Sequence, residues 1–181
     1  MARHAYKIDP AGGTAGHPAA GPAILDAGRF AADNRRRLSG PGLRSFLAIA
    51  DAWGLGEGER LLLLGLPGRS TYFGWVAKAR AGQDLTLPVD TLLRISGVLG
   101  VHKALRILFA DDPEGVAWLR DPHDAPTFGG QPPLALLTNG TPDGIMLVRR
   151  YLDALRGGVF AAPGSAVDAA DAYGDDDIVI V

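Results

Sequence analysis

The chain has 181 residues, enough for one ordinary domain or for one small domain with ordered appendages. Apolar residues make up 47% of it, which excludes a fully disordered protein. Charged residues make up 21% with a net charge of −2, and cysteine is absent, which excludes disulfides, thiolate metal sites and a cysteine nucleophile. No apolar run of ~18 residues predicts a membrane span, and the first residues lack a signal-peptide core, so we expect a cytoplasmic protein.

The small net charge conceals an asymmetry between the two parts of the chain. Residues 1–110 carry 14 Lys and Arg against 8 Asp and Glu, a net charge of +6. Residues 111–181 carry 4 against 12, a net charge of −8. A basic front and an acidic rear indicate two partners of opposite preference. Chance segregation of charges on a solvated surface explains the asymmetry equally well.

Before residue 43 the sequence predicts an arm with little regular structure. Residues 8–23 consist mainly of Pro, Gly and Ala, which bury too little apolar surface to offset the entropy of ordering. Residues 24–37 predict a short helix that ends in the three arginines Arg35 to Arg37. The sequence Ser39-Gly-Pro-Gly42 then predicts a break in the chain.

Residues 43–110 predict about five helices with short connections and no strand. One helical stripe contains Leu43, Phe46, Leu47, Ala50 and Trp53. Further helices are expected over 59–66, over 71–80 with Ser70 as N-cap, and over 88–99 and 101–109, with Gly100 between these two.

Residues 111–160 predict short helices separated by loops rich in Pro and Gly. Two of them are expected over 113–119 and 134–137. A third begins after Thr141 as N-cap, with Pro142 in its first turn, and ends at Gly157. The residues beyond 160 are small and acidic.

Nothing in the sequence has the pattern of an enzyme. It has neither a GxxxxGK[ST] phosphate loop nor a GxGxxG motif after a strand, and no nucleophile is paired with a base. His102, on a helical stretch, is expected to be an ordinary surface or core residue and not a catalytic base. His123 lies between Asp121 and Asp124 without the spacing of a closed metal site. We therefore expect no catalytic residue, no metal and no cofactor.

Residues 59–80 have the pattern of a helix-turn-helix, in which the second helix carries polar residues near its start. Phe73, Trp75 and Val76 are expected to pack inward. The side chains expected outside, for contacts with DNA phosphates or base edges, are Arg69, Ser70, Thr71, Tyr72, Lys78 and Arg80. If DNA binds, Arg35 to Arg37 are expected to add phosphate contacts. Small helical bundles often carry this pattern without binding DNA, so both readings stay open.

The end of the sequence combines three acidic residues, four β-branched residues and a terminal carboxylate. It reads Asp175, Asp176, Asp177, Ile178, Val179, Ile180 and Val181. Four consecutive β-branched residues favour an extended conformation. The segment fits either a frayed terminus or a strand that inserts into a partner.

Two segments of the chain carry motifs whose order along the sequence matches that of one known family. Residues 59–109 contain Ser70-Thr-Tyr-Phe-Gly-Trp75 followed by Leu-rich helices. Residues 128–158 contain the more specific motifs, which are Gly130-Gln-Pro-Pro-Leu134, the Asn139-Gly140 turn and Val148-Arg-Arg-Tyr-Leu-Asp153. In this order they resemble the antitoxins of the Xre/MbcA/ParS group, the partners of RES-domain toxins, and the ParS type most of all. Val159 stands where family members commonly carry Trp.

The resemblance implies an all-α fold, with an Xre-like helix-turn-helix bundle followed by a small helical toxin-binding domain. The implied divisions are an arm 1–42, a helix-turn-helix domain 43–110, a toxin-binding domain 111–160 and an acidic tail 161–181. On this basis we expect toxin contacts from the tail residues 175–181 and from Arg149, Arg150 and Asp153.

The resemblance also implies a function. Such antitoxins bind a cognate toxin that uses NAD, block its active site, often dimerise, and in many cases repress their own operon. The alternative is a helix-turn-helix transcription regulator in which the rear domain only dimerises.

Overall fold

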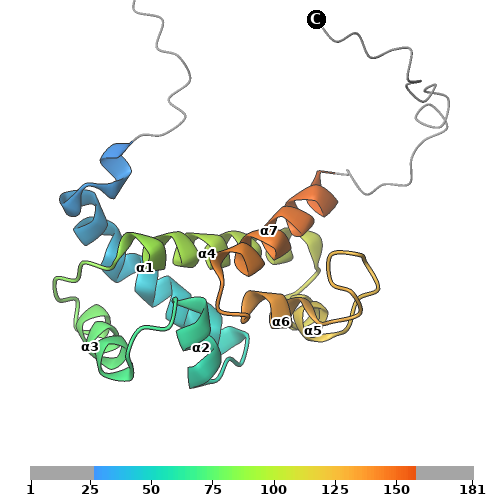
Figure 1. Cartoon of the computed structure of the whole chain (residues 1–181), viewed down its shortest axis with the longest axis horizontal. Coiled ribbons are helices and arrows are strands. Elements are labelled where there is room, and N and C mark those ends of the chain that lie inside the picture. Colours follow the sequence, from blue (N-terminus) through green and yellow to red (C-terminus); the bar gives the residue numbers. More distant parts are fainter. Residues whose placement is uncertain (1–26, 158–181) are drawn as a thin grey trace, which may run out of the picture.

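The computed structural model describes residues 27–157, and every regular element in this range is a helix (Figure 1). The predicted all-α fold class is thus confirmed for the described residues. In chain order the elements are the 3-10 turn η1 (Ala27–Phe30), α1 (Ala32–Ala52), α2 (Glu57–Leu63), α3 (Arg69–Arg80), α4 (Val89–Leu108), α5 (Asp112–Arg120), α6 (Pro133–Leu137) and α7 (Pro142–Arg156). None of these helices is long and apolar enough to cross a membrane.

Helix α4 is the central element, and helices from both halves of the chain cover it (Figure 1). α1 and α7 pack along α4, and α2 and α5 also contact it. α3 packs on α1, and α6 contacts both α5 and α7. One hydrophobic cluster runs from Phe46 in α1 through Val101 in α4 to Val148 in α7, all of them fully buried. The front and rear halves therefore share one core.

The predicted break at Ser39-Gly-Pro-Gly42 was wrong, because α1 continues through it. Pro41 has no N–H and removes one helical hydrogen bond, but tertiary hydrogen bonds hold the helix on its N-terminal side. The Ser39 hydroxyl donates to the Arg35 carbonyl and accepts the Leu87 N–H at 2.8 Å. Arg35 in turn donates to the Leu87 carbonyl. The predicted domain limit at residue 43 therefore falls inside α1.

Helix α4 is also continuous, so the division predicted at Gly100 was wrong. A β-carbon at Gly97 would lie 2.7 Å from Ile145, and one at Gly100 would lie 2.8 Å from the Arg149 guanidinium. Both glycines thus leave room for α7 to lie close against α4. This packing offsets the cost of glycine within a helix, which is about 1 kcal/mol per residue.

The predicted helix ends are correct in the rear and partly wrong in the front. Thr141 caps α7, because its hydroxyl accepts the Gly144 N–H at 3.2 Å, and α7 ends at Gly157 as expected. Ser70 is not the N-cap of α3. That helix begins two residues earlier, at Arg69, with Gly68 as its N-cap.

Candidate functional site

Helix α7 presents a row of charged side chains beside its contact with α4. Asp153 lies between two cations, with carboxylate oxygens 3.7 Å from the Nε of Arg149 and 3.1 Å from the Nη2 of Arg156. Arg149 extends over Gly100 of α4, and Arg150 is exposed. Solvent-accessible ion pairs of this kind contribute little to stability. The structure thus brings the predicted residues of α7 together on one accessible surface.

The turn that leads into α7 is organised around Asn139. Its side-chain oxygen accepts both the backbone N–H and the hydroxyl of Thr141, each at 2.8 Å. Gly140 has a φ of 83°, a left-handed conformation that favours glycine. Gly144 packs so closely against the Leu136 carbonyl and the Asn139 side chain that no β-carbon fits there. This turn therefore sets the direction in which α7 leaves α6.

An aromatic cluster joins the loop before α6 to α5 and α7. Trp118 stacks on Tyr151 with ring centroids 6.2 Å apart, and Phe128 meets both rings edge-on. His123 lies 4.9 Å from the Trp118 ring, with its Nε2 2.8 Å from the Trp118 carbonyl oxygen. Between residues 27 and 157 no group of three His, Cys, Asp or Glu side chains is placed to hold a metal. His123 thus contributes to packing within this cluster.

Helices α2 and α3 follow one another across a short turn, as expected for a helix-turn-helix. The inward face of α3 differs from the prediction. Tyr72 is 4% exposed and Phe73 is 50% exposed, so both expectations for these side chains were wrong. α3 packs on α1 through Tyr72, Val76 and Ala79, which follow the i, i+4, i+7 spacing of one helical face. The buried face therefore starts one residue earlier than predicted.

The other five predicted DNA-contact residues are exposed on α3. They are Arg69, Ser70, Thr71, Lys78 and Arg80. Arg69 forms an ion pair with Glu57 of α2 at 2.7 Å. Arg35 is partly buried and donates to the carbonyls of Phe30 and Leu87, so it holds α1 in place, whereas Arg36 and Arg37 are exposed.

Arg94 of α4 connects the turn between α2 and α3 to the turn between α6 and α7. It is only 8% exposed, its Nε lies 2.7 Å from an Asp90 carboxylate oxygen, and its Nη1 donates to the Gly140 carbonyl at 3.0 Å. It also packs against Gly65, where a β-carbon would lie 3.0 Å from its Nε. The sequence signal for this link is only the i, i+4 spacing from Asp90 to Arg94. Its partner Gly140 is 46 residues away.

Replacing Arg94 by methionine is expected to lower the free energy of unfolding by about 2 kcal/mol, because the partly buried Gly140 carbonyl loses a charged donor. Chemical denaturation measures this change. The control is Lys103→Met, which removes an exposed cation from the same helix and should stay within about 0.5 kcal/mol of the original protein. Equal losses for the two variants would contradict a buried structural link at Arg94.

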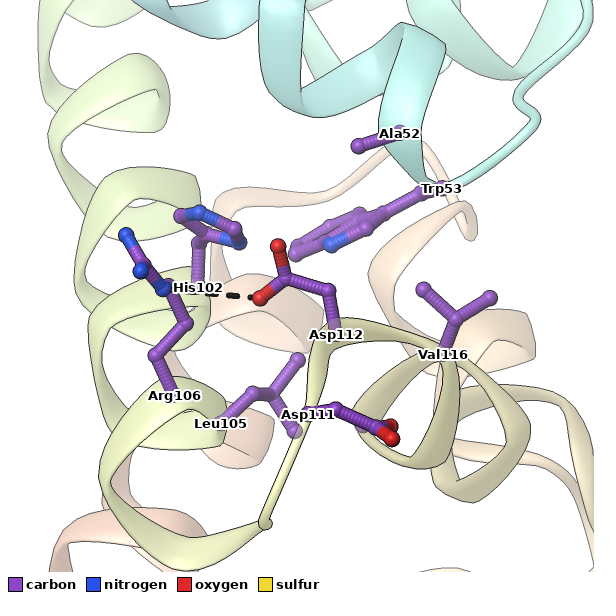
Figure 2. Close-up of a pocket in the computed structure, with 9 residues that line it drawn as sticks. Ala52, Trp53, His102, Leu105, Arg106, Asp111, Asp112 and Val116 are labelled. Carbon is purple, nitrogen blue, oxygen red and sulfur yellow. Dashed lines mark ion pairs between the residues drawn. The ribbon is translucent and has the colours of Figure 1, made fainter.

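A small cavity lies between the end of α1, helix α4 and the start of α5 (Figure 2). Its lining includes Trp53, His102, Arg106 and Asp112. The cavity volume of about 10 Å³ is room for about one water molecule, so it does not hold an organic substrate. The Arg106 Nε lies 3.4 Å from an Asp112 carboxylate oxygen. Burial lowers the pKa of His102; the Asp112 carboxylate opposes this shift and Arg106 adds to it.

This environment predicts a pH dependence of stability. Because the folded state lowers the pKa of His102 from 6.5, protonation favours the unfolded chain. The stability contributed by His102 should be present above pH ~6.5 and lost as the pH falls toward the lowered pKa. Thermal unfolding between about pH 7.5 and 5.5 should show a steeper loss for the original protein than for His102→Gln. Parallel curves would contradict the prediction.

The predicted toxin contacts from Asp175 to Val181 lie outside the described residues. They stay a prediction from the sequence. The same holds for the arm before residue 27.

Comparison with known proteins identifies a known domain family in the rear half of the chain. Residues 104–158 match the family model of the antitoxin Xre/MbcA/ParS C-terminal toxin-binding domain. This segment contains the last turn of α4, the aromatic cluster, the Asn139 turn and the charged surface of α7. The chain is also 45% identical over 116 residues to "Uncharacterized protein y4oB" of Sinorhizobium fredii (strain NBRC 101917 / NGR234), which is 64% of this chain and 84% of the relative. The protein therefore belongs to the Xre/MbcA/ParS-type antitoxins.

Proposed function

We propose that this antitoxin binds a RES-domain toxin and blocks the site where the toxin binds NAD. The observation that carries the proposal is the match of residues 104–158 to a toxin-binding domain, on which α7 carries the exposed Arg150 and the half-buried Arg149 and Asp153. The net charge of −8 over residues 111–181 supports it. A cleft that holds the NAD pyrophosphate must attract anions and is therefore expected to be basic. The protein acts by binding, not as an enzyme, and does so in the cytoplasm.

The test is co-expression of the antitoxin with a RES-domain toxin, taken from the neighbouring gene where that gene encodes one. We expect a stable complex in size-exclusion chromatography with mass measurement. NAD consumption or ADP-ribosylation by the toxin should stop when the antitoxin is added. If the two proteins elute separately and the toxin stays active, the proposal fails and the regulator alternative gains support.

We also propose that the antitoxin forms a homodimer within this complex. Several large apolar side chains are about half exposed or more and would be covered by a second copy. They are Leu38, Leu66, Phe73, Leu93 and Ile107. A monomeric mass at micromolar concentration, both with and without toxin, would contradict dimer formation.

A second function, repression of its own operon, is supported by the front half. The exposed side of α3 carries Arg69, Thr71 and Lys78, and residues 1–110 have a net charge of +6. Exposed cations and hydroxyls on such a helix suit contacts with phosphates and base edges. A gel-shift assay on the DNA upstream of its gene, at low salt and with or without toxin, tests this function. A negative result in this assay would not contradict the antitoxin proposal, because neutralisation of the toxin does not require DNA.

A further inference from the structure

A polar hollow opens between α1 and the loop that connects α3 to α4. Its volume is about 380 Å³, and half of its ten lining residues are charged: Asp33, Arg36, Arg37, Arg44 and Asp84. Arg36 and Arg44 lie two helical turns apart on one face of α1, with Gly40 between them. Because Gly40 has no side chain, the Arg44 guanidinium can lie over it: a β-carbon at Gly40 would be 3.4 Å from the Arg44 Nη1. The glycine and proline within α1 thus coincide with the floor of this hollow.

The arginines of the hollow keep donors for a further ligand. Arg44 donates one N–H to the Ala79 carbonyl at 3.0 Å, and a guanidinium has five N–H groups. Arg36 pairs with Asp33 at 2.7 Å, but the two side chains are 56% and 88% exposed, and such pairs are weak. Arg37 donates to the Asn34 side-chain oxygen at a long 3.4 Å. An anion with strong acceptor oxygens can therefore compete for these groups.

The hollow adjoins the last turn of α3. The Gln83 N–H, in the loop that lines the hollow, donates to the Lys78 carbonyl at 2.9 Å. Arg44 reaches the Ala79 carbonyl in the same turn, where Lys78 and Arg80 are exposed. The cations of α1 and those of α3 thus lie on neighbouring parts of the surface.

We propose that this hollow binds a phosphate of the DNA backbone when α3 lies on a duplex. The inference rests on the proposed DNA binding and not on toxin neutralisation. Arginine forks match phosphate oxygens, and backbone contacts of this kind position a protein without reading its sequence. Asp84 stands at the same hollow and opposes the phosphate, so the charge of the site can be tested in both directions.

The experiment measures binding of the full chain to two labelled duplexes by fluorescence anisotropy, across a range of salt concentrations. One duplex is the DNA upstream of the gene, and the other has the same composition in scrambled order. The double variant Arg36→Gln, Arg37→Gln should bind both duplexes at least roughly fivefold more weakly at low salt, the factor for one unit charge at ~4 Å in water. Its salt slope should fall by about 0.9 for each lost phosphate contact.

The second arm uses Asp84→Asn, which removes the opposing charge and should strengthen binding to both duplexes. A purely structural role of the loop predicts no such gain. The control Lys103→Gln removes one exposed cation from α4, outside the hollow, and should change binding less than the loss of Arg36 and Arg37. Circular dichroism verifies that all variants keep their helices.

Three results would overturn the inference. The first is an equal effect of the arginine variant and Lys103→Gln. The second concerns pyrophosphate, whose binding to the original protein and to the double arginine variant is measured by calorimetry. If the variant loses pyrophosphate binding but binds the duplexes as the original protein does, the hollow is a site for a free anion. The third is no duplex binding by the original protein, which removes the DNA function as well. The antitoxin function is judged separately, from the toxin assay.

Discussion

Gly144→Ala is expected to lower the free energy of unfolding by about 3 kcal/mol. The added β-carbon would collide with the Leu136 carbonyl and would lie 2.6 Å from the amide nitrogen of Asn139. The carbonyl belongs to the backbone of α6, and Asn139 is held by its two hydrogen bonds to Thr141. Neither group can move unless α6 and α7 separate. Urea denaturation with circular dichroism measures the loss.

The same substitution should also weaken the toxin complex, because the direction of α7 depends on this turn. The matched control is Gly58→Ala in α2, where nothing lies within 4 Å of the added β-carbon. Since alanine is the better helix former, this control should be neutral or stabilising by up to about 1 kcal/mol. If Gly144→Ala is as stable as Gly58→Ala and binds toxin normally, the packing described for the α6–α7 turn is not what holds it.

Deleting residues 175–181 is expected to leave the antitoxin–toxin complex intact and yet to release toxin activity by about tenfold or more. We propose that the folded segment 104–158 provides the docking surface and that the tail residues 175–181 cover the NAD cleft of the toxin. The 14 residues 161–174 can span up to about 46 Å when extended. One buried aliphatic side chain contributes roughly 1.5–3 kcal/mol, and tenfold corresponds to about 1.4 kcal/mol.

NAD consumption or ADP-ribosylation by the purified complex measures the effect of the deletion. Replacing Asp175 to Asp177 by alanine should weaken inhibition more at low salt than at high salt, because salt screens charge pairing. The control replaces Asp168 and Asp171, two carboxylates of the tail that precede residue 175, by alanine. This variant should inhibit like the original protein. Full inhibition by the truncated antitoxin would show that the folded rear segment alone blocks the toxin.

The local elements of the rear half could be predicted from the sequence. Thr141 and Pro142 mark the start of α7, and the glycine at 157 marks its end. These signals depend on hydrogen bonds between residues at most four positions apart, so they can be recognised in the sequence without knowledge of the fold. The charged surface of Arg149, Arg150 and Asp153 follows from helical periodicity alone.

The front half shows where local signals fail. Ser39-Gly-Pro-Gly42 and Gly100 have the composition of helix breaks, yet α1 and α4 continue through them. Hydrogen bonds to Leu87 hold α1, and the contact with α7 makes Gly100 necessary for packing. Helix propensities amount to about 1 kcal/mol or less per residue except for proline, so tertiary contacts override them.

Composition and motifs in the sequence by themselves determined the helical class, the lack of cysteine chemistry, the division into a basic front and an acidic rear, and the resemblance to these antitoxins. The tertiary structure alone decided which side of α3 is buried, how Arg94 ties the helix-turn-helix turn to Gly140, and where α1 opens a hollow lined by Arg36, Arg37 and Arg44. The physical reason is the range of the interactions. Periodicity and capping act within a few residues, whereas burial, close glycine contacts and buried hydrogen bonds join residues about 50 positions apart, and no local pattern encodes their partners.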